Sequence, residues 1–173
     1  LRNPFFRLYL AERDFDAAMA VVNELRGGQT KGRPSKGRAR PSSRRGDKTQ
    51  ISYMLAQLYL KQGSPARALP EIEVLRQALQ NNKNDKKLEL NLWETQGMYL
   101  CATGSGSAGL KLLQKAVNRT KDDYSHHAWG NGAFYLEAWG IGALMVNKLD
   151  VAEEAFHEAL AHDPGSVRAA LGM

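Results

Sequence analysis

The residues best suited to metal chemistry are two adjacent histidines, His126 and His127, which follow two acids, Asp122 and Asp123. A zinc site needs three or four such ligands that converge with defined spacing. Adjacent residues on a helix point about 100° apart, so the two imidazoles do not readily share one ion. We therefore interpret this segment as a polar loop between helices and expect no metal site.

The single cysteine, Cys101, could act as a nucleophile if folding brought a histidine to it. Its sequence neighbours, Tyr99, Leu100 and Ala102, include no basic residue that would activate the thiol. We expect a thiol that is packed in the core or faces a groove. Because one cysteine can form no internal disulfide, the sequence fits a reducing, cytoplasmic compartment better than secretion.

A glycine-rich segment, residues 104–107 (GSGS), precedes a predicted helix, where a phosphate could bind. It lacks the GK[ST] signature and the preceding strand of a nucleotide-binding loop. We interpret it as a turn between helices. Since no catalytic set converges anywhere in the sequence, we predict that the protein is not an enzyme and has no cofactor.

The elements that position these residues are predicted to be helices, because apolar residues recur at helical spacing along most of the chain. No stretch shows the sustained alternation that predicts a strand. Ser64 and Pro65 are a candidate N-cap and first helical residue, and Asp150 and Glu153 are spaced as a capping box. Pro70 should kink its helix or mark the true start of that helix. The pattern predicts an all-α fold of antiparallel helix-turn-helix pairs.

A basic segment, residues 27–48, carries most of the charge: it holds eight Lys or Arg and one acid, whereas the rest holds 16 basic and 17 acidic residues. It has no large apolar residue, so it cannot bury enough surface to offset its ordering entropy. We predict a disordered loop. A nucleic acid or an acidic partner could bind it electrostatically, although it offers no aromatic residue for base stacking. Within it, Ser43 follows Arg38 and Arg40 with the spacing of a site for basophilic protein kinases.

Four glycines, Gly130, Gly132, Gly140 and Gly142, interrupt one predicted helix that is rich in aromatic residues. Each glycine inside a helix destabilises it by about 1 kcal/mol relative to alanine. We therefore expect the backbone of this helix to pack closely against its neighbours. The alternative is a shallow site into which a ligand peptide presses.

The helix pairs resemble the tetratricopeptide repeat, a helix-turn-helix unit of about 34 residues with small and large residues at fixed positions. The last pair carries the most complete match, with Gly140 in its first helix, Ala152, Phe156 and Ala159 in its second, and Pro164 after it. The earlier pairs match at Tyr9, Ala18 and Val22; at Ala56, Tyr59, Gly63, Ala68 and Ile72; and at Trp93, Gly97, Leu100, Gly104, Gly109, Leu113 and Ala116. Small residues let helices approach closely, and large ones fill the holes between successive pairs.

The resemblance implies an α-solenoid in which the pairs stack as one domain over residues 1–173. The predicted pairs span about 1–26, 49–80, 88–118 and 128–163, with the loop at 27–48 and the start of a further helix at 166–173. Residues 81–87 and 118–127 look like insertions between pairs. Because both chain ends fall inside predicted helices, we expect a fragment of a longer protein.

In the resembled family, the first helices of the pairs line a concave surface that binds a partner protein. The resemblance therefore implies a scaffold or adaptor whose groove suits a helix or an extended segment of its partner. The groove residues would be Tyr53, Gln57, Lys61, Asn91, Glu94, Met98, Phe134, Glu137 and Ile141.

The best-known ligands of the family are the C-termini of heat-shock chaperones, whose carboxylate is clamped by Lys, Asn and Arg. The positions that would form this clamp here carry Tyr53, Gln57, Thr95, Asn91 and Ala138. The clamp is missing, so we do not expect a chaperone C-terminus as the ligand. No apolar run approaches the roughly 20 residues of a membrane span, so none is predicted.

Overall fold

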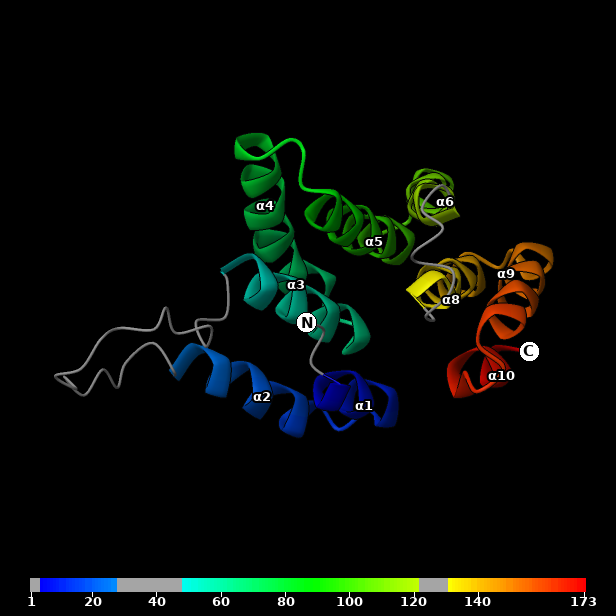
Figure 1. Cartoon of the computed structure of the whole chain (residues 1–173), viewed down its shortest axis with the longest axis horizontal. Coiled ribbons are helices and arrows are strands. Elements are labelled where there is room, and N and C mark those ends of the chain that lie inside the picture. The colour runs from blue at the N-terminus through cyan, green and yellow to red at the C-terminus, as the bar shows by residue number, and fades with distance from the viewer. Residues whose placement is uncertain (1–3, 28–47, 122–130) are drawn as a thin grey trace, which may run out of the picture. The chain divides into compact units, whose positions relative to one another are not determined.

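The computed structural model describes residues 4–27, 48–121 and 131–173, and all of their regular elements are helices. The prediction of an all-α fold is therefore confirmed for these residues. The interior of the basic segment, with Ser43, and the His126–His127 pair lie outside the described residues. The described helices are α1 (Pro4–Glu12), α2 (Phe15–Gly27), α3 (Lys48–Lys61), α4 (Pro65–Asn81), α5 (Lys86–Ala102), α6 (Gly106–Lys121), α8 (Asn131–Met145), α9 (Leu149–His162) and α10 (Val167–Gly172) (Figure 1).

Four short turns of the same construction join these helices into the pairs α1/α2, α3/α4, α5/α6 and α8/α9. Each turn contains one residue with positive φ: Arg13 (59°), Gly63 (70°), Gly104 (89°) and Asn147 (56°). In each turn, the residue that follows the positive-φ residue donates its N–H in a hydrogen bond of 2.8–2.9 Å. The acceptor is the carbonyl oxygen of the residue five positions before this donor. This is the Schellman arrangement that ends helices. The donor and acceptor residues are Asp14 and Tyr9, Ser64 and Tyr59, Ser105 and Leu100, and Lys148 and Ala143.

The second helix of each pair is buried at the same distances from this turn. Five positions after the residue with positive φ stands a buried small residue, and nine positions after it stands a larger side chain at most 1% exposed. The small residues are Ala18, Ala68, Gly109 and Ala152, and the larger ones are Val22, Ile72, Leu113 and Phe156. The described helices therefore repeat one pattern of turn and burial four times, at residues that the sequence pattern had singled out.

The chain divides into two compact units, Leu1–Leu75 and Arg76–Met173, with the boundary inside α4. That the whole chain is one domain stays a prediction. In unit 1, α2 contacts both α1 and α3. The guanidinium of Arg67 lies 4.2 Å from the centroid of the Tyr59 ring, which links α4 to the end of α3. The core of this unit consists of Phe6, Leu10, Ala18, Val22, Ile51, Met54, Leu55 and Leu58.

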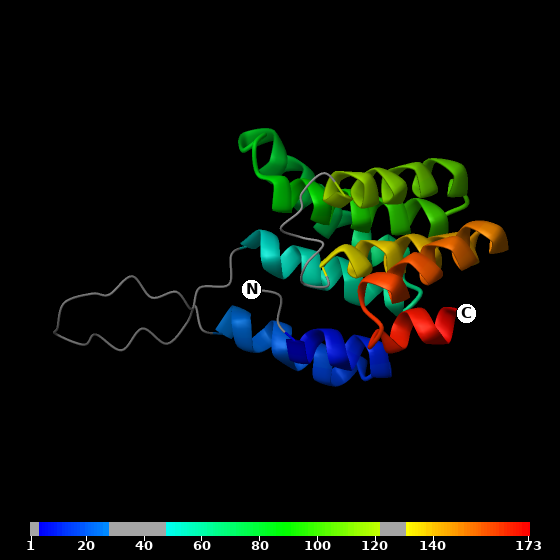
Figure 2. The same ribbon diagram turned by 45° about the vertical axis from the view of Figure 1, so that its right-hand side comes forward.

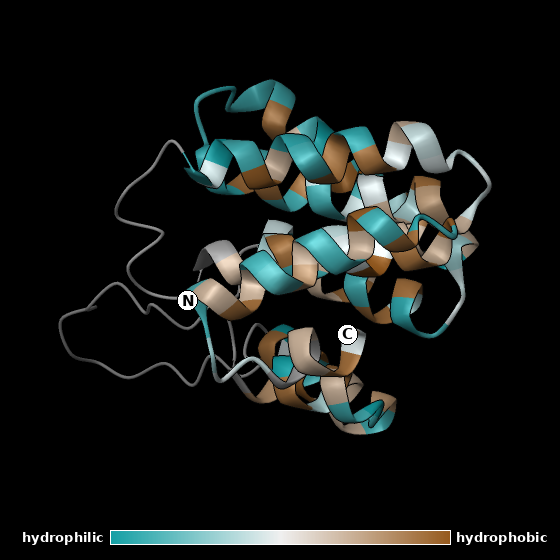
Figure 3. Ribbon diagram, turned by 90° about the vertical axis from the view of Figure 1, so that its right-hand side faces the viewer, coloured by the Kyte–Doolittle hydropathy of each residue, from teal (hydrophilic) through white to brown (hydrophobic). Residues whose placement is uncertain are grey.

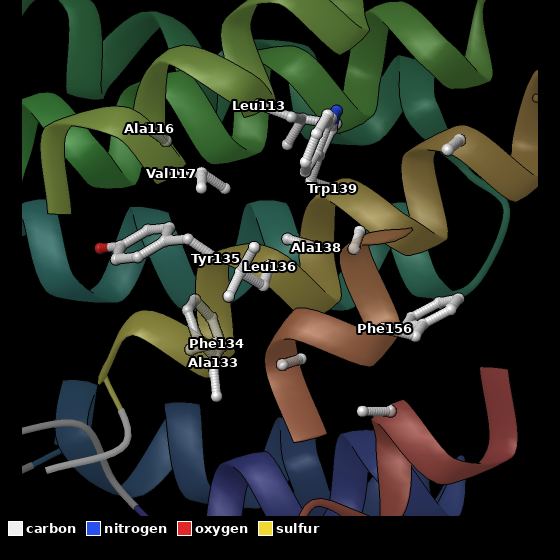
Figure 4. Close-up of a cluster of buried hydrophobic side chains, with 14 of the residues drawn as sticks. Leu113, Ala116, Val117, Ala133, Phe134, Tyr135, Leu136, Ala138, Trp139 and Phe156 are labelled. Carbon is white, nitrogen blue, oxygen red and sulfur yellow. The ribbon is translucent and has the colours of Figure 1, made fainter. Parts of the chain in front are cut away.

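In unit 2, α8 is the central helix and contacts α5, α6, α9 and α10. The pairs α5/α6 and α8/α9 lie side by side (Figure 2). Residues 133–140 of α8 are all buried, as expected for a helix that is apolar on every side. Trp139 is directed toward α6 beside Leu113, whereas Phe134 is directed to the other side of α8 (Figure 4). Along α6 and α9, by contrast, polar and apolar residues alternate, as in helices with one buried face (Figure 3).

Glycines set the distance between α5 and α6. A Cβ atom on Gly97 would lie 2.7 Å from Cγ of Leu113. A Cβ atom on Gly109 would lie 2.6 Å from both the carbonyl oxygen of Gly97 and the Sγ atom of Cys101. The two helices therefore cross with their backbones in contact, which only glycine at these positions permits.

The predicted close packing of the glycine-rich helix is confirmed at Gly140 and Gly142 of α8. A Cβ atom on Gly140 would lie 2.6 Å from the ring of Phe156, and one on Gly142 would lie 2.5 Å from Leu113. Gly172 of α10 also lies against the ring of Phe156. Phe156, which is fully buried, therefore fills a site lined by glycines of α8 and α10.

One prediction about a helix start was wrong, and of the two alternatives for Pro70 the structure excludes one. The capping box fails because α9 begins at Leu149, two residues earlier than an N-cap at Asp150 would give, with Lys148 at the N-cap and no side-chain cap. The turn at Asn147 sets this start, and Asp150 instead lies in the first turn, where its charge favours the helix dipole. Pro70 lies inside α4, which begins at Pro65, so it does not mark the start of that helix.

Candidate functional site

Three of the predicted groove residues lie on α3 in unit 1. Tyr53, Gln57 and Lys61 are spaced four residues apart and share one face of the helix. Tyr53 is buried, whereas Gln57 and Lys61 are half-buried. The Nε2 atom of Gln57 donates a 2.9 Å hydrogen bond to the hydroxyl oxygen of Tyr53. This face of α3 is therefore polar, ordered by its own side chains and partly accessible.

Three more predicted groove residues, Asn91, Glu94 and Met98, share one face of α5 in unit 2. Asn91 and Glu94 are buried, and the Oδ1 atom of Asn91 has no hydrogen-bond partner among the described residues. Met98 is half-buried and packs against the core of the unit. Of the three, Met98 alone presents part of its side chain to solvent.

The last three, Phe134, Glu137 and Ile141, share one face of α8. Phe134 and Glu137 are buried, and Ile141 is half-buried against the core. The hydroxyl of Ser166 donates a short hydrogen bond to Oε1 of Glu137. Since Ser166 is also the N-cap of α10 and accepts from the N–H of Ala169 at 3.2 Å, this contact ties α10 to α8.

Five of the nine predicted groove residues are thus buried and four are half-buried. Helical spacing predicts which residues share a face but not how much of that face a neighbouring helix covers. Because α5 and α8 contact each other, Met98 and Ile141 lie on adjacent first helices of unit 2. That the nine residues line one partner-binding groove stays a prediction.

Cys101 is a packed thiol, as the sequence predicted. It is buried, and its Sγ atom donates to the carbonyl oxygen of Gly106 at 3.9 Å. Burial raises the pKa of this thiol from 9.0 to about 11. The thiol is therefore protonated at neutral pH and is a poor nucleophile. The glycine-rich residues 104–106 lie at the turn into α6, also as predicted.

A cleft of about 370 Å³ lies between α6 and the start of α9 in unit 2, and we call it the α6/α9 cleft. One wall consists of Ser107, Leu110, Lys111 and Gln114, whose spacing places them on one face of α6. This periodicity is visible in the sequence, but sequence reasoning missed the cleft because the other wall is distant in the chain. That wall consists of Trp139, Val146, Lys148 and Val151.

No known family, curated protein or solved structure matches this chain in the comparisons made with each. In the described ranges, no cluster of His, Cys, Asp or Glu side chains could hold a metal ion. The helices described here are also too short or too polar to cross a membrane.

Proposed function

We propose that this chain is a protein–protein interaction scaffold of tetratricopeptide-like repeats, and that a segment of a partner protein binds along the first helices of its pairs. The observation that carries the proposal is the unit repeated four times: a Schellman turn, a buried small residue five positions after its positive-φ residue, and a buried larger residue nine positions after it. Stacked helix pairs of this kind generate extended binding surfaces.

Within unit 2, the partner would contact Met98 on α5 and Ile141 on α8. Both side chains are half-buried, so an apolar partner group can cover their remaining exposed surface without opening the core. A thioether adapts easily to the shape of a ligand. The protonated thiol of Cys101, on the same helix as Met98, is a poor nucleophile, so it gives no support to nucleophilic catalysis at this residue.

A second candidate function is the binding of nucleic acid or of an acidic partner through residues 27–48. The concentration of eight basic residues in this segment favours it. Such binding would weaken steeply as salt is raised, because it depends on released counterions. Replacement of residues 28–47 by a Gly/Ser linker of equal length, which keeps a connection between α2 and α3, would abolish this binding but spare binding by the first helices.

The test is a selection of peptides displayed on phage against the whole chain, followed by affinity measurements on the best binder. We expect the double variant Met98→Gln, Ile141→Gln to bind about tenfold more weakly or worse. Leu69→Gln, at an exposed apolar position of α4, is the matched control and should bind normally. Circular dichroism should show the same helix content in both variants.

Two results would overturn the proposal: no peptide is enriched, or the selected peptides bind the double variant as well as the unmodified chain. Loss of peptide binding on replacement of residues 28–47 by the Gly/Ser linker alone would favour the second candidate function.

A further inference from the structure

The α6/α9 cleft has an apolar floor and an incompletely paired polar rim. Its floor includes Trp139 and Leu110, and Val146 and Val151 extend it toward α9. Gly106 allows this packing, because a Cβ atom there would collide with Val146. The floor is therefore built by close contact between the start of α6 and the α8/α9 turn.

The rim of the cleft carries four polar side chains, Ser107, Lys111, Gln114 and Lys148. None of them forms a hydrogen bond or ion pair with another side chain in the part of the chain that the structure describes. The rim thus offers two ammonium groups, a hydroxyl and an amide to a ligand.

Other basic residues of α6 are already engaged. The Nζ atom of Lys115 lies 4.0 Å from the centroid of the Trp93 ring, and that of Lys121 lies 2.6 Å from a carboxylate oxygen of Glu158. Among the residues that the structure describes, no carboxylate lines the cleft, so Lys111 and Lys148 give it a positive potential that attracts anions.

We propose that the α6/α9 cleft binds a partner protein segment in which one large apolar side chain is flanked by carboxylates. The volume of the cleft lies at the low end of the range for ligand pockets, about 300–1,000 Å³, which suits one or two side chains. Three exposed apolar residues, Leu144, Met145 and Leu149, stand next in the chain to the α8/α9 turn that lines the cleft.

This site lies mainly on α6 and on the α8/α9 turn, with Trp139 of α8 and Val151 of α9, and includes none of the first-helix residues of the proposed function. It is a separate binding surface. Its test can therefore fail while the proposed function stands, and the reverse also holds.

The probe is a short fluorescein-labelled peptide with a central phenylalanine flanked on each side by glutamates, measured by fluorescence anisotropy. We expect it to bind the whole chain, to bind less tightly as salt is raised, and to bind the double variant Lys111→Glu, Lys148→Glu about tenfold more weakly or worse. Lys83→Glu, Lys87→Glu is the matched control, since it changes the net charge equally at two exposed lysines away from the cleft. Gln114→Trp, at an exposed position of the rim, should fill the cleft and weaken binding without changing the charge.

Several results would overturn this inference. The first would be that the peptide does not bind the unmodified chain, or that a peptide with lysines in place of the glutamates binds equally well. The second would be that Lys111→Glu, Lys148→Glu and its control Lys83→Glu, Lys87→Glu lose affinity to the same extent. The third would be a sedimentation experiment in which the chain dimerises and Lys111→Glu, Lys148→Glu is a monomer. A second copy of the chain would then occupy the cleft.

Discussion

Replacing Gly109 by alanine tests the close crossing of α5 and α6. Helix propensity alone would make the change stabilising by about 1 kcal/mol. In the structure, however, the new Cβ atom would lie 2.6 Å from the carbonyl oxygen of Gly97 and 2.9 Å from the backbone nitrogen of Cys101. These backbone atoms cannot rotate away, so the helices must separate, and overpacking costs about 1–3 kcal/mol. We place this cost in the upper half of that range and expect the free energy of unfolding to fall by about 1–2 kcal/mol.

The assay is urea denaturation followed by far-ultraviolet circular dichroism, with Gly27→Ala as the control. Gly27 is also a helical glycine, but a Cβ atom there would have no atom within 4 Å, so its substitution should leave stability unchanged or slightly higher. An increase of about 1 kcal/mol in Gly109→Ala would show that propensity decides the outcome and that the two backbones are not in contact.

Three further predictions concern unit 2. Ala152→Trp or Ala159→Trp should unfold the α8/α9 pair, because both residues are at most 2% exposed and overpacking costs about 1–3 kcal/mol or more; unchanged melting temperatures in both would contradict the register. Cys101 should react slowly with iodoacetamide in the folded chain, and stability should fall as pH rises from 9.0 toward about 11, because the unfolded thiol ionises first; a Cys101→Ala variant with the same alkaline loss would refute this assignment. Ser166→Ala should destabilise the chain by about 1–3 kcal/mol, since the start of α10 loses its cap and the buried Glu137 loses a donor; an unchanged urea midpoint would show that this contact contributes nothing.

The sequence predicted the four helix pairs because both signals that define them are local. Residues such as Gly63 and Gly104 adopt positive φ in turns, and small and large residues such as Ala152 and Phe156 recur at helical spacing. The start of α9 was missed because Asn147, not a glycine, supplies the positive φ there. Asparagine enters this conformation more often than most residues but is a weaker signal than glycine.

The candidate sites were harder to predict because exposure depends on contacts between distant residues. Glu137 is a charged residue at a predicted groove position, but it is buried and accepts a hydrogen bond from the Ser166 hydroxyl, which is far along the chain. The α6/α9 cleft likewise joins Lys111 to Lys148, and nothing in either local sequence indicates that they share a cavity.

The most direct test of the central claim is a methyl-group nuclear magnetic resonance titration of the whole chain with a peptide selected by display. Labelled methionine and isoleucine methyl groups report separately on Met98 and Ile141 and, near the α6/α9 cleft, on Met145. If a partner segment binds along the first helices, the methyl resonances of Met98 and Ile141 should shift most, saturating at the measured affinity. Saturable binding that leaves both of these resonances unmoved would contradict the account.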